Sequence, residues 1–349
     1  MNLNKEQYEE LLEAFNIPKL PTEPNYWFIR TEGGSFYNIF KAQKYVSIGY
    51  DKVDLDLIVD KKDDAIKDEI ALLYPDCKRP GVIVSQLRRF KYNVKKGDII
   101  LIPDKSSRNL CIGQATSDVY QLSKKDKQLE LNSEIYTYEK RIDTTWFAEI
   151  PKNNFDLYIY KLLNSHQAIV SCDLYKSFVN RMVFPIYVQD GNMHLSINID
   201  KKENITFLNY QGLFEMLDSC IKLYNDIMDT ELKPDINVKV TANSPGVFEI
   251  LGDPKIIIAI VIGFALVGGK IKYKNTKKET QLNIESEGIL EKISKLYEQY
   301  NRTKIKLVKT LIDRNFDDMQ LNTSSKEKVI KREKIIDKPN DNNQTSLFD

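Results

Sequence analysis

The stretch Ile256–Gly269, with the sequence IIIAIVIGFALVGG, contains neither a charged side chain nor a hydroxyl group, and Lys255 and Lys270 flank it. As an α-helix these residues would be about 21 Å long at about 1.5 Å each, whereas a hydrocarbon core of roughly 30 Å requires about 20 apolar residues. The segment is therefore predicted to form a helix that is very apolar and short for a membrane span. Where this helix is buried decides the fold of the C-terminal half.

Three interpretations of the apolar helix are open: a core helix buried on all sides, a membrane-associated helix, and a helix in an oligomer interface. A permanent crossing is disfavoured, because the lysines after Gly269 favour the cytoplasmic side and the long N-terminal part without a signal would have to cross. Small residues four positions apart let helices approach closely, in lipid as in a core. The residues predicted to form the membrane or oligomerisation surface are Ile256, Ala259, Gly263, Phe264 and Gly269.

Two modules are predicted in the part of the chain that contains this helix. Residues 235–320 form a C-terminal module in which Pro254 stands in the first turn of the apolar helix, where its missing N–H leaves no bond unmade. Residues 151–234 form a central α+β module. It contains a hairpin closed at Asp190–Gly191, a dipeptide that tolerates the positive φ angles of a tight turn, and an amphipathic helix over Gln211–Met228.

The N-terminal part consists of short apolar runs separated by turns. Residues 1–24 are predicted to form an amphipathic helix and a linker with three prolines. Residues 25–150 contain the runs YWFIR, YVSIGY, DIILIP, LCIGQ and TWFAEI, which have the length of strands, with helical stretches between them. Short strands bounded by Gly or Asp indicate a small, strongly curved sheet or barrel covered by helices. The predicted fold class is thus α+β, with a barrel-like N-terminal domain.

The composition is that of a soluble globular protein: of 349 residues, 42% are hydrophobic and 29% are charged. The 51 basic and 50 acidic residues give a net charge of +1, so a nucleic-acid contact needs a local basic patch. Four dispersed cysteines indicate reduced thiols, and the acidic start predicts no signal peptide. A cytoplasmic location is expected, with inner-membrane association if the apolar helix meets lipid. No cofactor and no metal site is predicted, because neither histidine has ligand-type neighbours.

Three segments carry a family resemblance: WFIRTEGGSFYNIFKAQKYVSIGYD (27–51), SQLRRFKYNVKKGDIILIP (85–103) and LCIGQ (110–114). In this order they resemble the N-terminal domain found in front of Mrr-like restriction endonucleases and other prokaryotic defence proteins. The resemblance covers roughly residues 25–150 and departs at Tyr50, where the family usually has tryptophan. It implies a PUA-like or EVE-like barrel that reads nucleic acid, with a base held by aromatic side chains.

The same segments contain side chains suited to nucleic acid. An extruded base needs aromatic faces for stacking and polar groups for its edge, and phosphates need Arg or Lys. The run RRFKYNVKK at residues 88–96 indicates either a phosphate-facing surface or a solvated helix end, and the aromatic residues would equally fill a barrel core. The predicted nucleic-acid contacts are Trp27, Arg30, Tyr50, Gln86, Arg88, Arg89 and Lys91.

Residues 321–349 are polar and charged, and this tail is predicted to be disordered because it has too little apolar surface to fold. It ends in QTSLF, which resembles the short motif by which bacterial proteins dock on the replication sliding clamp. The docking residues would be Gln344, Leu347 and Phe348. The apolar pair at the end of a polar tail indicates a protein partner.

Two functions follow as hypotheses. The first is a prokaryotic antiphage-defence protein, expected to be a homo-oligomer, that senses nucleic acid, with DNA favoured, and acts through the apolar and membrane-inserting segment. The second is a soluble DNA-associated restriction nuclease or nuclease subunit, recruited by the sliding clamp, with the apolar helix as core. Asp229, Glu231 and Lys233 form an acid-acid-lysine string, for which a solvated turn is the simpler account. No other catalytic constellation is visible, so enzymatic activity is left open.

Overall fold

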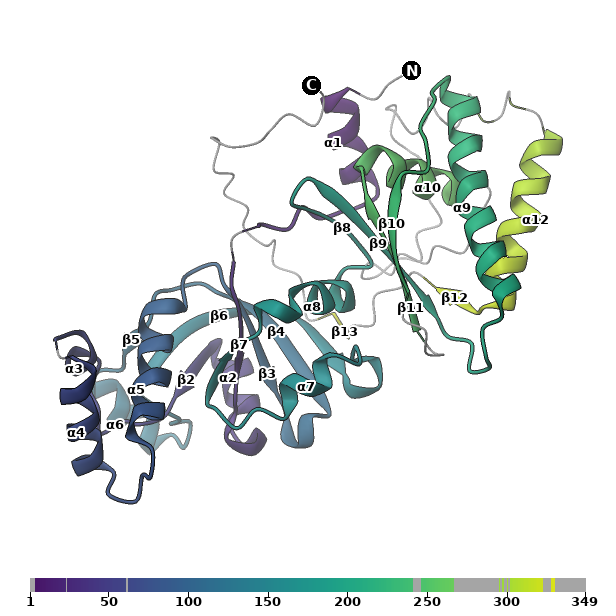
Figure 1. The fold of residues 1–349 in the computed structure, drawn as a ribbon. Helices are drawn as coiled ribbons and strands as arrows, with labels where there is room; N and C mark the ends of the chain where they lie inside the picture. The colour runs from purple at the N-terminus through teal and green to yellow at the C-terminus, as the bar shows by residue number, and fades with distance from the viewer. Residues whose placement is uncertain are drawn as a thin grey trace. The chain divides into compact units, whose positions relative to one another are not determined.

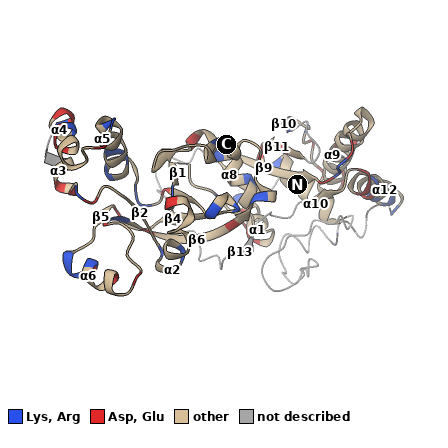
Figure 2. Cartoon of the chain, turned by 90° about the horizontal axis from the view of Figure 1, so that it is seen from below, with Lys and Arg blue, Asp and Glu red and all other residues tan. Residues whose placement is uncertain are grey.

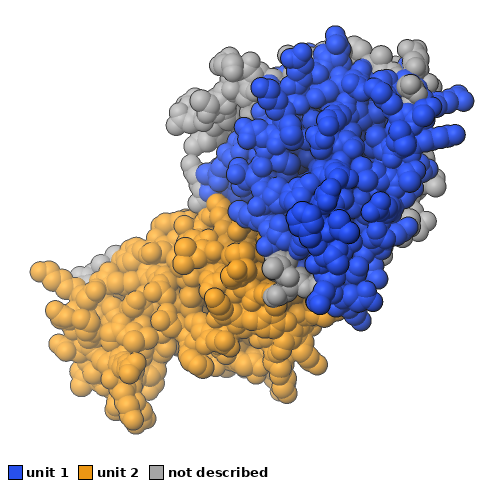
Figure 3. All heavy atoms as spheres, turned by 45° about the vertical axis from the view of Figure 1, so that its right-hand side comes forward, with its two compact units in different colours: residues 1–22, 184–325, 338–349 blue, residues 23–183, 326–337 orange. Residues whose placement is uncertain are grey.

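The chain forms two compact units, drawn in separate colours in Figure 3. Unit 1 comprises Met1–Thr22, Phe184–Ser325 and Lys338–Asp349, and unit 2 comprises Glu23–Val183 and Lys326–Asp337. The structure is a computed structural model. It describes residues 4–22, 24–60, 62–240, 246–266, 302–322 and 328–329, together with residues 295, 297 and 300.

Unit 2 is built around one curled, half-barrel sheet (Figure 1). Its strands are β1 (Tyr26–Ile29), β2 (Tyr45–Ile48), β3 (Ile99–Pro103), β4 (Asn109–Ala115), β5 (Tyr120–Gln121), β6 (Lys140–Pro151), β7 (Ile169–Ser171) and β13 (Lys328–Val329). The main path runs β13-β6-β4-β3-β1-β7, and β2 and β5 pair with β6 outside this path. β1 and β3 are parallel, and the other pairs are antiparallel. The predicted α+β class is therefore confirmed, with a half-barrel in the N-terminal domain.

A bulge helps this sheet to curl. The register between β4 and β6 shifts between Ile112 and Gly113. A Cβ atom on Gly113 would lie 2.6 Å from Cε3 of Trp146, so only glycine leaves room for the indole at this point. Bulges bend a strand and increase its twist, and here the bend lies in the middle of the pairing with the longest strand of unit 2.

Short helices surround the half-barrel, and two of them, α4 and α5, pack together. Their side chains Ile66, Ile70, Ile83 and Leu87 belong to the main core of unit 2. A π-helical turn over Arg89–Asn93 continues α5. The helices of unit 2 are α2 (Tyr37–Gln43), α3 (Leu55–Asp60), α4 (Asp63–Leu73), α5 (Pro80–Arg88), α6 (Lys124–Asn132), α7 (Ile159–Leu163) and α8 (Lys176–Val183).

Unit 1 packs helices on a second sheet. Its strands are β8 (Ile186–Gln189), β9 (Asn192–Ile199), β10 (Ile236–Val240), β11 (Gly246–Gly252) and β12 (Leu321–Asn322), in the order β10-β11-β9-β12 with β8 on β9. The β8–β9 hairpin turns at Asp190 and Gly191, with φ angles of 53° and 73°, as the sequence predicts. The helices are α1 (Lys5–Ala14), α9 (Phe207–Met228), α10 (Pro254–Leu266) and α12 (Arg302–Asp318).

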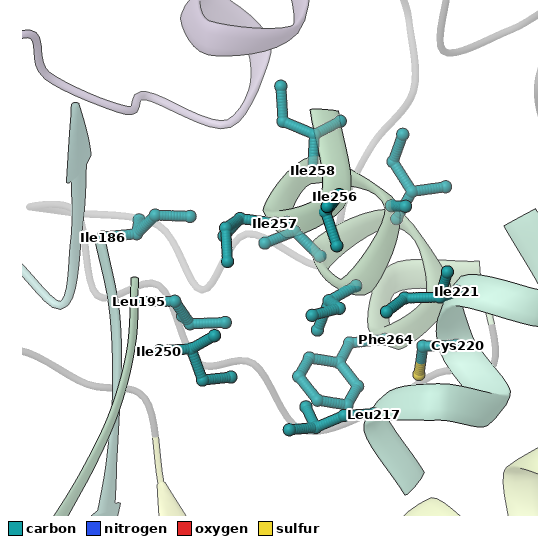
Figure 4. Packing of buried hydrophobic residues seen from close by; sticks show 14 of the residues in the cluster. Ile186, Leu195, Leu217, Cys220, Ile221, Ile250, Ile256, Ile257, Ile258 and Phe264 are labelled. Atoms are coloured by element: carbon teal, nitrogen blue, oxygen red, sulfur yellow. The ribbon is translucent and has the colours of Figure 1, made fainter. Parts of the chain in front are cut away.

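The apolar helix is α10, and the protein's own chain buries it. Ile256 to Phe264 lie in one core with side chains of α1, α9, α12 and the sheet, and no apolar side chain among them is more than 7% exposed. Figure 4 shows Ile257 facing the strand residues Ile186, Leu195 and Ile250, and Phe264 near Leu217 of α9. The core interpretation of the helix therefore holds for these residues.

The small residues of α10 serve this packing. Ala259 is buried, and a Cβ atom on Gly263 would lie 2.6 Å from Cβ and 3.0 Å from Cα of Cys220 on α9. The close helix approach expected for a membrane or oligomer surface is thus made inside unit 1, which corrects those two interpretations for Ile256, Ala259, Gly263 and Phe264. Gly269 lies outside the described residues. Within the described ranges, no helix is both long and apolar enough to cross a membrane.

The structure divides the chain differently from the prediction. The N-terminal helix forms as α1, and its Tyr8 and Leu11 lie in the core of unit 1. The predicted central and C-terminal modules, residues 151–234 and 235–320, do not separate, because α9 and α10 share that core. Leu321–Asn322, predicted to begin the disordered tail, pairs with β9. The docking residues Gln344, Leu347 and Phe348 lie outside the described residues.

Candidate functional site

Trp27, predicted to stack on a base, is an internal anchor. It is 3% exposed, and its Nε1 donates to Oδ2 of Asp98 at 2.7 Å. The same carboxylate accepts from the backbone N atoms of Asn25 and Lys95 at 3.0 and 2.9 Å. Burial raises the pKa of Asp98, and the three donors partly offset this shift. The indole therefore ties β1 to the turn before β3.

Three of the predicted nucleic-acid contacts hold one segment, Ser165–Ile169, which precedes and enters β7. A guanidinium nitrogen of Arg30 donates to the carbonyl of Ser165. Oε1 of Gln86 accepts from the backbone N of Ala168. Nη1 of Arg89 donates to the carbonyl of Ile169 at 3.0 Å. The residue after β1, together with α5 and the turn that continues it, therefore positions the segment.

Arg88 and Lys91 belong to the same part of α5 and its π turn. The Arg88 guanidinium pairs with Asp63 on α4 at an N···O distance of 2.5 Å and lies 5.9 Å from the ring centroid of Tyr92. In unit 2, α4 and α6 each carry both acidic and basic residues (Figure 2). Lys91 is half-exposed. Among the predicted cations of this run, Arg88 and Arg89 therefore have internal carboxylate and carbonyl partners.

Replacing Arg89 with alanine is expected to destabilise unit 2 by about 2 kcal/mol, because hydrogen bonds from a charged group to a part-buried carbonyl are lost. Lys91→Ala, three residues on from Arg88, should change stability by less than about 0.5 kcal/mol. Tryptophan emission during urea unfolding measures the stability of unit 2, since both tryptophans, Trp27 and Trp146, lie in this unit. Equal midpoints for the two variants would contradict the assigned role.

Tyr50 adopts a backbone conformation that bulky residues rarely take, with φ at 69°. Its carbonyl accepts from Nζ of Lys140 at 2.9 Å and from the backbone N of Val53 at 3.0 Å. The Lys140 side chain is fully buried, and its Nζ lies 3.7 Å from Oδ1 of Asp51. Such a conformation costs on the order of 1 to 3 kcal/mol and persists only where its surroundings fix it. The buried lysine and the backbone of Val53 are the two donors to this carbonyl among the described residues.

Four aromatic rings meet around this turn. Tyr50 and Tyr74 pack edge to face with centroids 5.9 Å apart, and Phe36 and Tyr138 do so at 5.2 Å. A Cβ atom on Gly49 would lie 3.2 Å from Cζ of Tyr138, so the glycine before Tyr50 brings the two pairs together. All four rings are partly buried, and those of Phe36, Tyr50 and Tyr74 pack against the main core of unit 2. We call Phe36, Tyr50, Tyr74 and Tyr138 the Tyr50 cluster.

Polar groups border the Tyr50 cluster on two sides. Burial raises the pKa of both Tyr50 and Tyr138, and the negative charge of Glu32 adds to both shifts. The Gln86 side chain hydrogen-bonds to Tyr50 and partly offsets the shift there. Glu32 also has a positive φ, of 48°. The cluster thus combines aromatic faces with an exposed carboxylate and a buried amide.

A second buried cation fixes the backbone of Tyr138. Nε of Arg141 donates to the Tyr138 carbonyl at 2.8 Å, and its two terminal nitrogens pair with the carboxylate of Glu130. The guanidinium lies 4.1 Å from the ring centroid of Tyr45. Arg141 is 2% exposed. The adjacent residues Lys140 and Arg141, which open β6, therefore hold the backbones of the two tyrosines.

Sequence reasoning identified Tyr50 and Gln86 but missed the other members of this site. The signal in the sequence is weak: two adjacent cations follow Glu139 at the start of an apolar run, and Lys and Arg in such a place are usually exposed to solvent. Among the described residues, no group of three His, Cys, Asp or Glu side chains is arranged to hold a metal ion.

The comparison with known proteins finds a match in the part of the chain that contains this site. Residues 27–170 match the model of a family described as a domain of unknown function (DUF8426). This match runs from β1 into β7 and contains the whole Tyr50 cluster together with Gln86, Lys140 and Arg141. The chain matches no curated protein and no solved structure.

Proposed function

We propose that unit 2 binds nucleic acid, with DNA favoured, and holds one unpaired base against the Tyr50 cluster, as a sensing domain of PUA-like or EVE-like type in prokaryotic antiphage defence. One observation carries the proposal: three partly buried rings lie around a left-handed tyrosine whose carbonyl is held by a buried lysine. The rings pack against the rim of the unit 2 core and keep part of their surface accessible to a ligand.

Each part of the cluster has a task in this proposal. Base stacking on aromatic side chains is worth about 1 to 3 kcal/mol per base and tolerates any sequence. The Tyr138 hydroxyl already donates to Glu32, so the Tyr50 hydroxyl and the remaining acceptor positions of the Glu32 carboxylate are offered to a base edge. Gln86 already accepts from Ala168, so its part is to position Tyr50.

Binding of a fluorescent single-stranded oligonucleotide by the full chain tests the proposal. Tyr50→Ala and Tyr138→Ala are expected to weaken binding between about fivefold and a hundredfold, the loss of one stacked base. Phe207→Ala removes an exposed ring on α9 of unit 1 and should leave the affinity unchanged. The proposal fails if the wild-type chain does not bind, or if both tyrosine variants bind as tightly as the Phe207 variant.

The response to binding is a separate part of the proposal. Release of α10 from unit 1 would open the core around Phe264 and Cys220. We therefore propose that the signal passes through an assembly of chains, with α10 kept in place. A homo-oligomer that changes size when the oligonucleotide is added would support this, and light scattering measures it.

A further inference from the structure

A second aromatic surface of unit 2 lies where α7 and α8 begin. Tyr158, directly before α7, stacks on Phe178 of α8 with ring centroids 4.4 Å apart and planes 19° from parallel. Tyr158 is 46% exposed, and the neighbouring Tyr160 and Leu157 are exposed as well. Phe178 therefore covers one face of the Tyr158 ring, while the rest of this side chain stays accessible to solvent.

Asp156 and Arg181 hold this pair in place. Oδ1 of Asp156 accepts from the backbone N of Tyr158 at 3.1 Å, and Oδ2 accepts from Nε of Arg181 at 2.8 Å. The guanidinium in turn lies 4.8 Å from the ring centroid of Phe178. Both charged side chains are only 6% exposed. The ring is thus oriented before any ligand arrives, which lowers the entropy cost of binding.

Lysines accompany the exposed rings. Nζ of Lys161 lies 5.6 Å from the ring centroid of Tyr158, and Nζ of Lys152 lies 6.0 Å from that of Tyr160. Lys176 lies over the ring of Tyr26, which is buried, at 5.7 Å. The flexible amines of Lys152 and Lys161 thus lie over the two exposed rings, from which they can move to a phosphate when a base stacks there.

The neighbouring carboxylates are used internally. Asp156 is paired with Arg181, and Asp173 accepts from the backbone N of Tyr26 and from the hydroxyl of Ser171, both at 2.7 Å. The surface therefore combines stacked rings with an excess of positive charge. This charge pattern complements a phosphate backbone better than an acidic or neutral apolar partner.

We infer that Tyr158, Tyr160, Lys152 and Lys161, here called the Tyr158 platform, form a second contact for single-stranded nucleic acid. A base stacks on Tyr158, and the lysines neutralise the flanking phosphates. This inference rests on the proposed function. The segment Ser165–Ile169 follows α7 and is held by Gln86 beside Tyr50, so both surfaces belong to one fixed framework of unit 2.

The test measures the affinity of the full chain for a labelled oligothymidylate across a range of salt concentrations. Tyr158→Ala is expected to weaken binding between about fivefold and a hundredfold, whereas Tyr158→Trp, which keeps a stacking face, should stay within about threefold of wild type. Lys152→Gln with Lys161→Gln should lower the slope of log affinity against log salt by about 0.7 for each phosphate that is no longer neutralised. Lys125→Gln, on α6, is the matched exposed lysine and should leave the slope unchanged.

The outcomes separate the two proposals. If the wild-type chain does not bind, the proposed function and this inference both fail. If Tyr50→Ala loses affinity while Tyr158→Ala and the double lysine variant behave like wild type, only the platform is overturned. Unchanged tryptophan unfolding midpoints show that Tyr158→Ala acts on binding, and equal losses for Tyr158→Ala and Tyr158→Trp would contradict stacking as the mechanism.

Discussion

Valine in place of Gly263 is expected to destabilise unit 1 by on the order of 3 kcal/mol. A Cβ atom at this position lies 2.6 Å from Cβ and 3.0 Å from Cα of Cys220, so the backbone of α9 would have to move. Overpacking of a core typically costs about 1 to 3 kcal/mol, and the cost is highest where the neighbour is backbone. Since α10 lies in the centre of the unit 1 core, the displacement has no route to the surface.

Gly212→Ala is the matched control for this prediction. A Cβ atom on Gly212 also meets an atom at 2.6 Å, but that atom is Oδ1 at the end of the buried Asn315 side chain on α12, and the next nearest atoms belong to the same side chain. Its expected cost is smaller than that of Gly263→Val, because a side chain yields more readily than a helix backbone. Chemical unfolding followed by the helical circular dichroism signal reports the helices of both units, and tryptophan emission, which reports unit 2 alone, identifies the part of the signal that belongs to unit 1.

A rescue experiment sharpens this test. Cys220→Gly removes the Cβ and Sγ atoms that the new side chain meets, so it should restore part of the stability lost in Gly263→Val. The double variant should therefore lose less stability than the sum of the losses of the two single variants. Equal stability of Gly263→Val and Gly212→Ala would contradict the close crossing of α9 and α10.

The length and apolarity of the segment Ile256–Gly269 predict its helix but not its surroundings. A helix that is apolar on every side suits a core and a membrane equally well. What decides between them is the set of partners, such as Cys220 on α9 and Ile186 on β8, which lie far away in the sequence. The local pattern carries no information about such partners. The hairpin at Asp190–Gly191 was predictable because its cause is local.

In the candidate site too, features with a local cause were predictable and features set by distant partners were not. Arg30 and Arg89 were predicted to face phosphates because phosphates need Arg or Lys, yet their partners belong to the segment Ser165–Ile169, more than 70 residues further along the chain. Tyr50 was predicted as an aromatic residue that stands where the resembling family usually has tryptophan. Its positive φ and the buried Lys140 that fixes it depend on strand pairing between β2 and β6, which single-sequence patterns do not give.

Replacing Arg141 with methionine is expected to destabilise unit 2 by about 3 to 5 kcal/mol. Methionine fills a similar volume but leaves the Glu130 carboxylate and the Tyr138 carbonyl without their donor. Removing one partner of a buried ion pair costs this much because the other charge stays desolvated. The variant should also weaken oligonucleotide binding, since the backbone of Tyr138 is no longer held.

The control separates a buried ion pair from an exposed one. Arg108, also in unit 2, is 71% exposed at the side chain and lies 3.8 Å from Asp104, so Arg108→Met should cost less than about 1 kcal/mol. Glu130→Gln combined with Arg141→Met should recover part of the loss, because the stranded charge is removed. Tryptophan emission during urea unfolding follows all of these variants. A cost below about 1 kcal/mol for Arg141→Met would mean that water reaches Glu130, and that the aromatic site does not depend on the two buried cations at the start of β6.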